Sequence, residues 1–516
     1  MWEPVSDNNA PGPSSPPEEA AFASVPQKTY TEVDYINFRS AEHDGRYNEL
    51  TESIRSNPES DIASRYSDRL SKRSILCIRV SFLNILLMGF RFMFNIGAYT
   101  TAGMAQTVVL NSVNDDYFQG TPTLGYVLWA VCCGTQALAY LFGPCVVAVI
   151  GPKTAMVSGA ACVSLYIACF IRPLTIALYI GAALMGFGVG IIWVVQQHFI
   201  TINSTSKRVM RNTGVFWGLY QSSLVTGNMF YFIMVHGAEQ IDTETRLIVF
   251  GTLTGISGIG IVVFALLVHP WCEKVRRPPH EYLTLSQNGA EPVPHRSAKE
   301  ALVATLKVAK NRDMLILMPI FCYIGVEGTF WVNVYGTSLG YTERFGTLRE
   351  SLVGLTGVFA GAGEIIGGLL LGFLGKWMHY NGKDGMLMFA MVVHVAAYYL
   401  TFLNTPSSAS LGMTDDGAYV DPDPYIAMVV AFLLGLGDAI FNSQCMAYLG
   451  HVYRHDCVSV FGVYQFWCAI ANCISFLYAT ILTIPYQLLI LVINAVMAAA
   501  GFCYVEWQAY RTHPPE

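Results

Sequence analysis

Long apolar segments are the feature that most restricts how this chain can fold. A helix that crosses a bilayer needs about 20 mostly apolar residues. The sequence holds twelve runs of that kind, and we expect the helix of the first to continue towards residue 110. The sequence therefore predicts an all-α membrane protein with twelve transmembrane helices. The runs cover residues 76–98, 123–147, 154–172, 174–198, 213–236, 247–269, 314–336, 351–374, 386–404, 425–449, 458–480 and 486–506.

The composition supports this interpretation and excludes several classes of function. Only 13% of the residues are charged and 53% are hydrophobic, whereas a typical soluble domain is about 25% charged. The net charge of -6 gives no basic surface for nucleic acid. The glycines of "GFGVG" (186–190) lie in an apolar run with no strand before it, so they do not indicate a phosphate loop. We expect a lipid bilayer as surroundings, no nucleic-acid partner, no metal, no cofactor and no enzymatic activity.

Positive charge marks one side of the membrane. Basic residues gather in the N-terminal tail and in every second loop, while the opposite loops are mainly acidic. Because cytoplasmic loops carry the excess of Lys and Arg, both termini are predicted to be cytoplasmic. The only glycosylation sequon, Asn203-Ser204-Thr205, then lies in the cytoplasm and should stay unmodified. The basic residues include Arg69, Lys72, Arg73, Lys153, Lys207, Arg208, Arg211, Lys376, Lys383 and Arg454.

The segments between the runs suggest a division into five parts. Residues 1–70 are polar and proline-rich, which predicts a disordered cytoplasmic tail. Residues 270–313 are predicted to be a cytoplasmic linker loop, and residues 509–516 a cytoplasmic C-terminus. The linker would separate an N-terminal bundle of six helices (75–269) from a C-terminal one (314–508).

The two predicted bundles share sequence motifs. "LMGFGVGIIWVV" (184–195) and "LLGLGDAIFNSQ" (433–444) have the frame Leu-x-Gly-x-Gly-x-x-Ile in common, with Val189 at the position of Asp438. "GLYQ" (218–221) matches "GVYQ" (462–465), and the glycines at 143 and 151 have the spacing of those at 367 and 375. Each pair lies six spans apart in the same orientation. Two parallel repeats of six helices are the arrangement of the major facilitator fold.

Further motifs resemble a branch of that superfamily. "ITIN" (200–203), "RNTGVFWGLYQSS" (211–223), "GAGEIIGG" (361–368), "FLLGLGDAIFNSQ" (432–444) and "VEW" (505–507) are similar to the Unc-ninety-three-like, or ion-channel regulatory, branch. The resemblance covers roughly residues 75–508. It implies that spans one, four, seven and ten line a central cavity, with spans two, five, eight and eleven beside them. It also implies that some members regulate or escort other membrane proteins.

The sequence departs from one superfamily pattern. Many facilitators carry an Asp/Arg-rich motif after span two that helps to hold the outward-facing state. Here "PCVVAVIGPK" (144–153) has Ala148 and Val149 at the charged positions, and the second copy "GLLLGFLGKW" (368–377) has Gly372 and Phe373. The loss of these charges puts ordinary alternating access in doubt without excluding it.

Three acidic residues lie deep in predicted spans. Glu327, Glu364 and Asp438 each stand 13 residues after the start of spans seven, eight and ten, which is about 20 Å along a helix. They should therefore lie at one depth and face the cavity. Buried charges normally pair or contact water. Two interpretations remain: a cation, proton or substrate site, or a structural clamp in which Arg91 of span one pairs with one acid.

Other polar residues in the spans are secondary candidates. Asn442 lies one helical turn after Asp438, and Gln444 follows it. Gln196, Gln197, Gln221, Gln465 and Asn228 could contact a ligand, although hydrogen bonds between helices are their more common role. His394 lies in span nine, which is peripheral in this fold, so we predict a structural role for it.

Two functions fit these observations. One is a transporter-like protein that moves a small solute or ion with proton or cation coupling. The other is a non-transporting regulator or trafficking partner of an ion channel or receptor. The segments "YINF" (35–38), "YNEL" (47–50) and "YLTL" (282–285) match a sorting pattern read by vesicle-coat adaptors, so the plasma membrane and endolysosomal membranes are both compatible locations.

Overall fold

The computed structural model describes residues 81–115, 118–203, 209–236, 242–265, 298–381, 384–453 and 457–512. The predicted tail, the three tyrosine motifs, residues 266–269 of the predicted sixth span and residues 270–297 of the predicted linker lie outside these ranges. The first helical span, Ser81–Ser112, contains a π-helical turn η1 (Phe92–Ile96) and α4 (Gly97–Ser112), which confirms its continuation past residue 98. Two antiparallel strands of two residues each follow, β1 (Asn114–Asp115) and β2 (Phe118–Gln119).

The described residues form twelve helical spans in two sets. After the first span, the N-terminal half contains α5 (Leu124–Ile150), α6 (Pro152–Cys169), α7 (Thr175–Ile202), α8 (Val209–Val235) and α9 (Thr243–Ala265). The C-terminal half begins with one span made of α13 (Arg312–Thr329), η2 (Phe330–Val334) and α14 (Tyr335–Tyr341). A 3-10 segment, η3 (Glu343–Leu348), leads to α15 (Arg349–Asn381), α16 (Asp384–Asn404), α17 (Pro424–Val452), α18 (Cys457–Ala479) and α19 (Ile484–Thr512).

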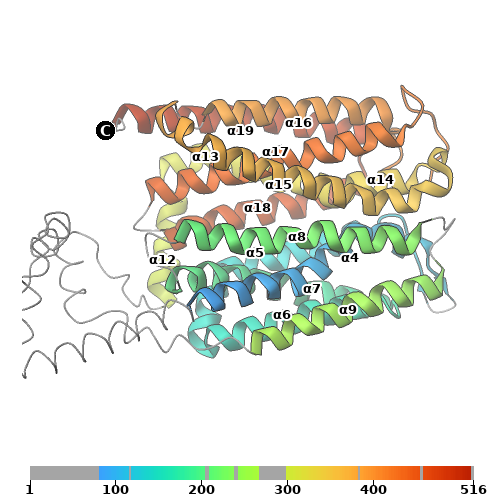
Figure 1. Cartoon of the computed structure of the whole chain (residues 1–516), viewed down its shortest axis with the longest axis horizontal. Coiled ribbons are helices and arrows are strands. Elements are labelled where there is room, and N and C mark those ends of the chain that lie inside the picture. Colours follow the sequence, from blue (N-terminus) through green and yellow to red (C-terminus); the bar gives the residue numbers. More distant parts are fainter. Residues whose placement is uncertain are drawn as a thin grey trace, which may run out of the picture. The chain divides into compact units, whose positions relative to one another are not determined.

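Ten of these described spans are long and apolar enough to cross a membrane by length and composition. The other two are α6, whose apolar stretch Lys153–Cys169 is shorter, and α8, which carries several polar residues. Figure 1 shows the helices of the N-terminal half (blue to green) beside those of the C-terminal half (yellow to red). The all-α fold with two six-helix repeats is confirmed; the exact domain boundaries stay a prediction.

The repeat is visible in how the helices pack. A Cβ on Gly186 of α7 would lie 2.0 Å from the carbonyl oxygen of Cys132, and one on Gly435 of α17 would lie 2.0 Å from that of Ala360. The shared glycines therefore let α7 approach α5, and α17 approach α15, in the same way. One sequence match needs correction. Gly367 of α15 packs on Ala439 of α17. The corresponding contact in the N-terminal half joins Ala139 of α5 to Gly190 of α7. The structural equivalent of Gly367 is therefore Ala139, which lies one turn before residue 143.

A second repeat element was not anticipated from the sequence. The π-helical turns Phe92–Ile96 ("FMFNI") and Phe330–Val334 ("FWVNV") occur at corresponding places in spans one and seven. Each contains a fully buried asparagine, Asn95 or Asn333. The first helix of each half therefore carries an irregularity inside its span. Such π-turns inside helices often mark functional sites.

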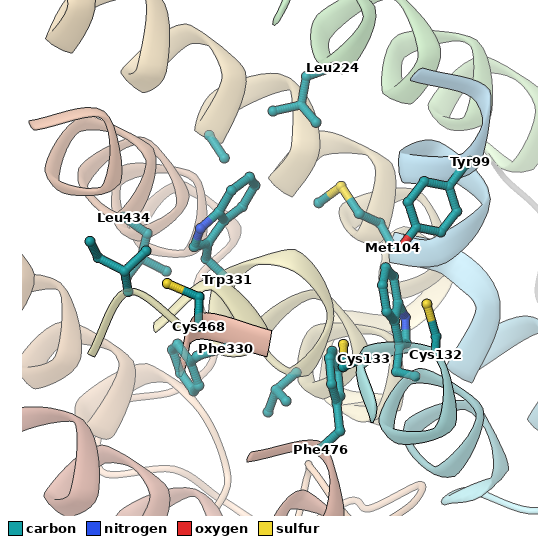
Figure 2. Close-up of a cluster of buried hydrophobic side chains, with 14 of the residues drawn as sticks. Tyr99, Met104, Cys132, Cys133, Leu224, Phe330, Trp331, Leu434, Cys468 and Phe476 are labelled. Carbon is teal, nitrogen blue, oxygen red and sulfur yellow. The ribbon is translucent and has the colours of Figure 1, made fainter. Parts of the chain in front are cut away.

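The most extensive contacts between the halves are made by two helix pairs, and polar bonds from Asn333 also join them. Helix α5 packs on α18, and α8 packs on α15. Asn333 donates to the carbonyl of Gly103 (2.7 Å), and the hydroxyl of Thr107 donates to Asn333 Oδ1 (2.8 Å). Figure 2 shows part of the apolar core, with Tyr99 and Met104 of the N-terminal half on one side and Trp331 and Phe330 of the C-terminal half on the other.

An amphipathic helix, α12 (Ala298–Ala309), occupies part of the segment predicted to be a linker loop. It contacts α5 and α18, one helix from each half, and lies at the end of the bundle that carries the C-terminus (Figure 1). Residues 298–309 therefore belong to the folded part of the chain, and only the preceding residues keep the expectation of a linker.

The structure adds a physical reason for the expectation that Asn203 stays unmodified. Its side chain is 2% exposed, accepts from Asn84 Nδ2 (3.0 Å) and donates to the carbonyl of Phe199 (3.0 Å). We expect glycosidase treatment to leave the electrophoretic mobility unchanged. Asn203→Ala should cost about 1–3 kcal/mol, because it leaves a buried polar partner unsatisfied. Thr205→Ala is the control, since it removes the sequon and keeps Asn203. A mobility shift abolished by both variants would contradict the expectation.

Candidate functional site

The three deep acids converge at the centre of the C-terminal half. Asp438 of α17 lies within hydrogen-bonding range of Glu327 from α13 and of Glu364 from α15. Asp438 is 8% exposed, Glu327 is 1% exposed and Glu364 is half-buried. The spacing in the sequence predicted a common depth, and the structure places these carboxyls against one another as a single group. We call Glu327, Glu364 and Asp438 the acid cluster.

Asn442 orients Asp438 within the acid cluster. Its Nδ2 donates to Asp438 Oδ1 at 2.7 Å and to the Asp438 carbonyl at 3.2 Å. The hydroxyl of Tyr464, on α18, donates to Asn442 Oδ1 at 2.8 Å. Tyr464 therefore fixes which end of the amide faces the acid. Gln444 is 3% exposed on the same helix.

His394 belongs beside the acid cluster, which the sequence analysis missed. Its Nε2 lies 3.4 Å from Glu327 Oε1 and 3.0 Å from the carbonyl of Leu434, and its Nδ1 lies 2.5 Å from the hydroxyl of Tyr323. A Cβ on Gly437 would lie 2.1 Å from His394 Nε2, so the glycine before Asp438 makes room for the ring. Helix α16, a peripheral span, thus places the titratable imidazole of His394 beside the acid cluster.

The N-terminal half has no equivalent of this chemistry at the repeat-related position. Gly188, the partner of Gly437 in the shared frame, packs against Gly159 of α6 and not against a histidine. Val189 stands where the C-terminal half has Asp438. The same backbone frame therefore folds with apolar residues, and at these described repeat-related positions the acid and the imidazole occur in the C-terminal half alone.

Gln221 connects the acid cluster to the N-terminal half. It lies on α8 and donates from Nε2 to Glu364 Oε2, across the contact between α8 and α15. Its repeat partner, Gln465, is half-buried on α18. Gln196 is fully buried on α7, and neither end of its amide has a hydrogen-bond partner among the described residues. Asn228 donates to the Leu224 carbonyl within α8, which is a structural bond. The side chain of Gln197 lies outside those described.

Arg91 is also buried, but its described contacts lie apart from the acid cluster. Its guanidinium donates from Nη1 to Met88 Sδ at 3.2 Å, and its Cζ lies 4.7 Å from the ring centre of Phe92. Both of these partners belong to its own span, and neither is an acid. The clamp in which Arg91 neutralises one acid stays a prediction.

Aromatic residues from both halves lie beside the acid cluster. Tyr220, next to Gln221, lies close enough to Glu364 and Asp438 to interact with them electrostatically. Its ring packs on Trp193 (5.7 Å between centroids) and Trp217 (5.7 Å). Trp331, in η2 of the C-terminal half, lies beside Asp438. Tyr220 of one half and Trp331 of the other thus lie beside the acid cluster.

Known proteins with solved structures share the fold. A transporter of the POT family in complex with 5-aminolevulinic acid aligns with a TM-score of 0.58 at 10% identity, over 83% of this chain and 96% of that one. The nucleoside transporter NupG aligns with a TM-score of 0.54 at 12% identity, over 82% and 98%. The partially occluded, inward-open xylose transporter XylE from E. coli gives 0.53 at 11%, over 85% and 100%. These likenesses show the major facilitator fold.

Sequence comparisons identify the family within this fold. The UNC93-like protein MFSD11 of Xenopus laevis is 34% identical over 430 residues, which cover 82% of this chain and 96% of the relative. Protein unc-93 homolog A of Danio rerio is 20% identical over 471 residues, which cover 84% and 93%. The family model for the ion channel regulatory protein UNC-93 matches residues 119–503. On this match and on the 34% identity, the chain belongs to the UNC-93 family.

Proposed function

We propose that this protein moves a small solute or ion across the membrane and that the acid cluster couples the movement to protons. The observation that carries the proposal is the contact of Asp438 with both Glu327 and Glu364. Carboxylates at such distances repel one another, so a proton or another cation must be shared among them. A group that gains and loses a proton deep in the membrane is what a proton-coupled transporter requires.

The hydrogen bond between Gln221 and Glu364 links this chemistry to movement. Gln221 belongs to one half and Glu364 to the other, and the two helices face each other along their length. An ionised Glu364 accepts a strong bond from the amide, whereas a protonated one accepts a weaker bond. Protonation of the acid cluster would therefore loosen a contact between the halves, whose relative rocking exchanges access between the two sides in this fold.

A second candidate function follows from the description of the family model, which names an ion channel regulator. In that role the protein would bind a channel or receptor in the membrane without moving solute.

Orientation with both termini in the cytoplasm belongs to both proposals and rests on the loop charges. Sealed vesicles with a protease-accessible tag on the N-terminus would test it.

The test of transport uses the purified chain in proteoliposomes that contain a pH-sensitive dye. Amino acids, small peptides, nucleosides, sugars and organic amines are added in turn, with and without an imposed pH gradient. We expect at least one class to cause proton uptake in the natural protein, and Glu364→Gln to remove it. Glu343→Gln is the matched control, because Glu343 is exposed in η3 of the same half. A stoichiometric channel or receptor in affinity purification, with no flux for any class, would contradict transport and support regulation.

A further inference from the structure

A basic pocket lies away from the acid cluster, where the start of α13 meets the last turns of α19. Its volume is about 210 Å³, and it lies at the end of the bundle that carries the C-terminus (Figure 1). Its lining consists of Arg312, Tyr504, Trp507, Gln508 and Arg511. Two arginines and two aromatic rings in one recess form a combination that the transport proposal does not use.

Aromatic neighbours hold both guanidinium groups. Arg511 Cζ lies 3.6 Å from the ring centre of Trp507, which is a close cation–π contact. Arg312 Nη2 donates to the hydroxyl of Tyr504 at 3.3 Å. A guanidinium has five N–H donors, and among the described residues no carboxylate forms an ion pair with either arginine. Two like charges share the recess, so a bound anion would relieve their repulsion.

The pocket ends an apolar stripe on α19. Leu489, Ile493, Met497, Tyr504 and Trp507 are all between 44% and 56% exposed. Their spacing by three, four or seven residues places them on one face of the helix. Tyr504 and Trp507 are the members of this stripe that contact the arginines, and aromatic residues are enriched in this way at the surface of a bilayer. Acyl chains beside the stripe would hold a head group at the pocket.

We propose that this pocket binds the phosphate of an anionic phospholipid. Arginine forks match phosphate oxygens with paired hydrogen bonds. Basic pockets between transmembrane helices on the cytoplasmic side bind such head groups, and the loop charges predict that side for this end of the bundle. A soluble phosphate compound shares the head-group chemistry, but it would make no use of the apolar stripe.

The test measures lipid retention and heat stability of the full chain. The protein is placed in nanodiscs of phosphatidylcholine alone, or with phosphatidylserine or phosphatidylinositol 4,5-bisphosphate, and bound lipid is counted by native mass spectrometry after transfer to detergent. We expect an anionic lipid to be retained and to raise the melting temperature. The double variant R312Q/R511Q should retain about tenfold less of it, because charged hydrogen bonds are lost. Arg344→Gln is the control, since Arg344 is an exposed arginine already paired with Asp421 (3.0 Å).

Soluble phosphate compounds and lysine variants provide two further tests of lipid binding at this pocket. Inorganic phosphate and soluble inositol trisphosphate should not raise the melting temperature at concentrations at which the lipids do. An equal effect of the soluble compounds would overturn the lipid assignment. If R312Q/R511Q does not fold, R312K/R511K keeps both charges and should still retain less lipid, because lysine lacks the paired donors. Retention unchanged in a folded variant would show that the lipid binds elsewhere.

Discussion

Replacing Asp438 by Asn is expected to reduce proton-driven flux to the level of vesicles without protein, while the protein remains folded. The amide keeps the shape and still accepts the hydrogen bond from Asn442 Nδ2, but it cannot gain or lose a proton at neutral pH. Val189 at the repeat-related position shows that the helix frame folds without the acid. Flux is measured with the dye-loaded proteoliposomes, and folding by thermal unfolding in detergent.

The stability data separate this role from a clamp with Arg91. If Asp438 neutralised Arg91, either change would leave a buried charge without its partner and cost about 3–5 kcal/mol. If the two residues act independently, we expect Asp438→Asn to cost no more than about 1 kcal/mol, because the amide keeps the hydrogen bond with Asn442. Its effect should add to that of Arg91→Met within about 0.5 kcal/mol. Strong rescue of one variant by the other would contradict the separation of the two sites.

Gly435→Ala is expected to be among the most destabilising small changes in the protein, at about 2–3 kcal/mol. The new Cβ would lie 2.0 Å from the carbonyl oxygen of Ala360. That atom belongs to the backbone of α15, so no side chain can rotate away and the two helices must separate. Asp438 and Glu364 lie on these same helices, and the substitution should therefore also lower proton-coupled flux. The measurement is thermal unfolding in detergent.

Gly462→Ala is the matched control for this prediction. Gly462 also lies in a helix of the C-terminal half, but a Cβ there would meet nothing within 4 Å. Alanine favours the helix over glycine by up to about 1 kcal/mol, so this variant should be as stable as the natural protein or slightly more stable. Equal melting temperatures for the two variants would show that α17 and α15 are not packed as closely as described.

The sequence predicted the parts of the fold that depend on length and periodicity. Runs of about 20 apolar residues indicate membrane helices whatever surrounds them, and the structure has a helix at each one. The acids could also be anticipated as a group, because equal distances from the starts of three spans give equal depths. Their direct contact follows from the glycines that bring α15 and α17 together, such as Gly435.

Other features of the site depend on tertiary packing and are only weakly indicated by the sequence. His394 reaches Glu327 only because Gly437 has no side chain, and nothing in the sequence near residue 394 indicates that contact. The π-turns at Phe92–Ile96 and Phe330–Val334 could have been noticed as a shared Phe-x-x-Asn pattern, but their geometry could not be read from it. The contacts of Arg91 with Met88 and Phe92 depend on which face of the first span packs inward.

Infrared difference spectroscopy tests the central claim most directly, because it detects a protonated carboxyl without any knowledge of the solute. Spectra of the purified protein are recorded while the pH is changed, in normal and in heavy water. We predict a pH-dependent band of a protonated carboxyl that is lost or shifted in Asp438→Asn, Glu327→Gln and Glu364→Gln and kept in Glu343→Gln. A natural protein without such a band at any pH, or a band unchanged in all three variants of the acid cluster, would contradict the account.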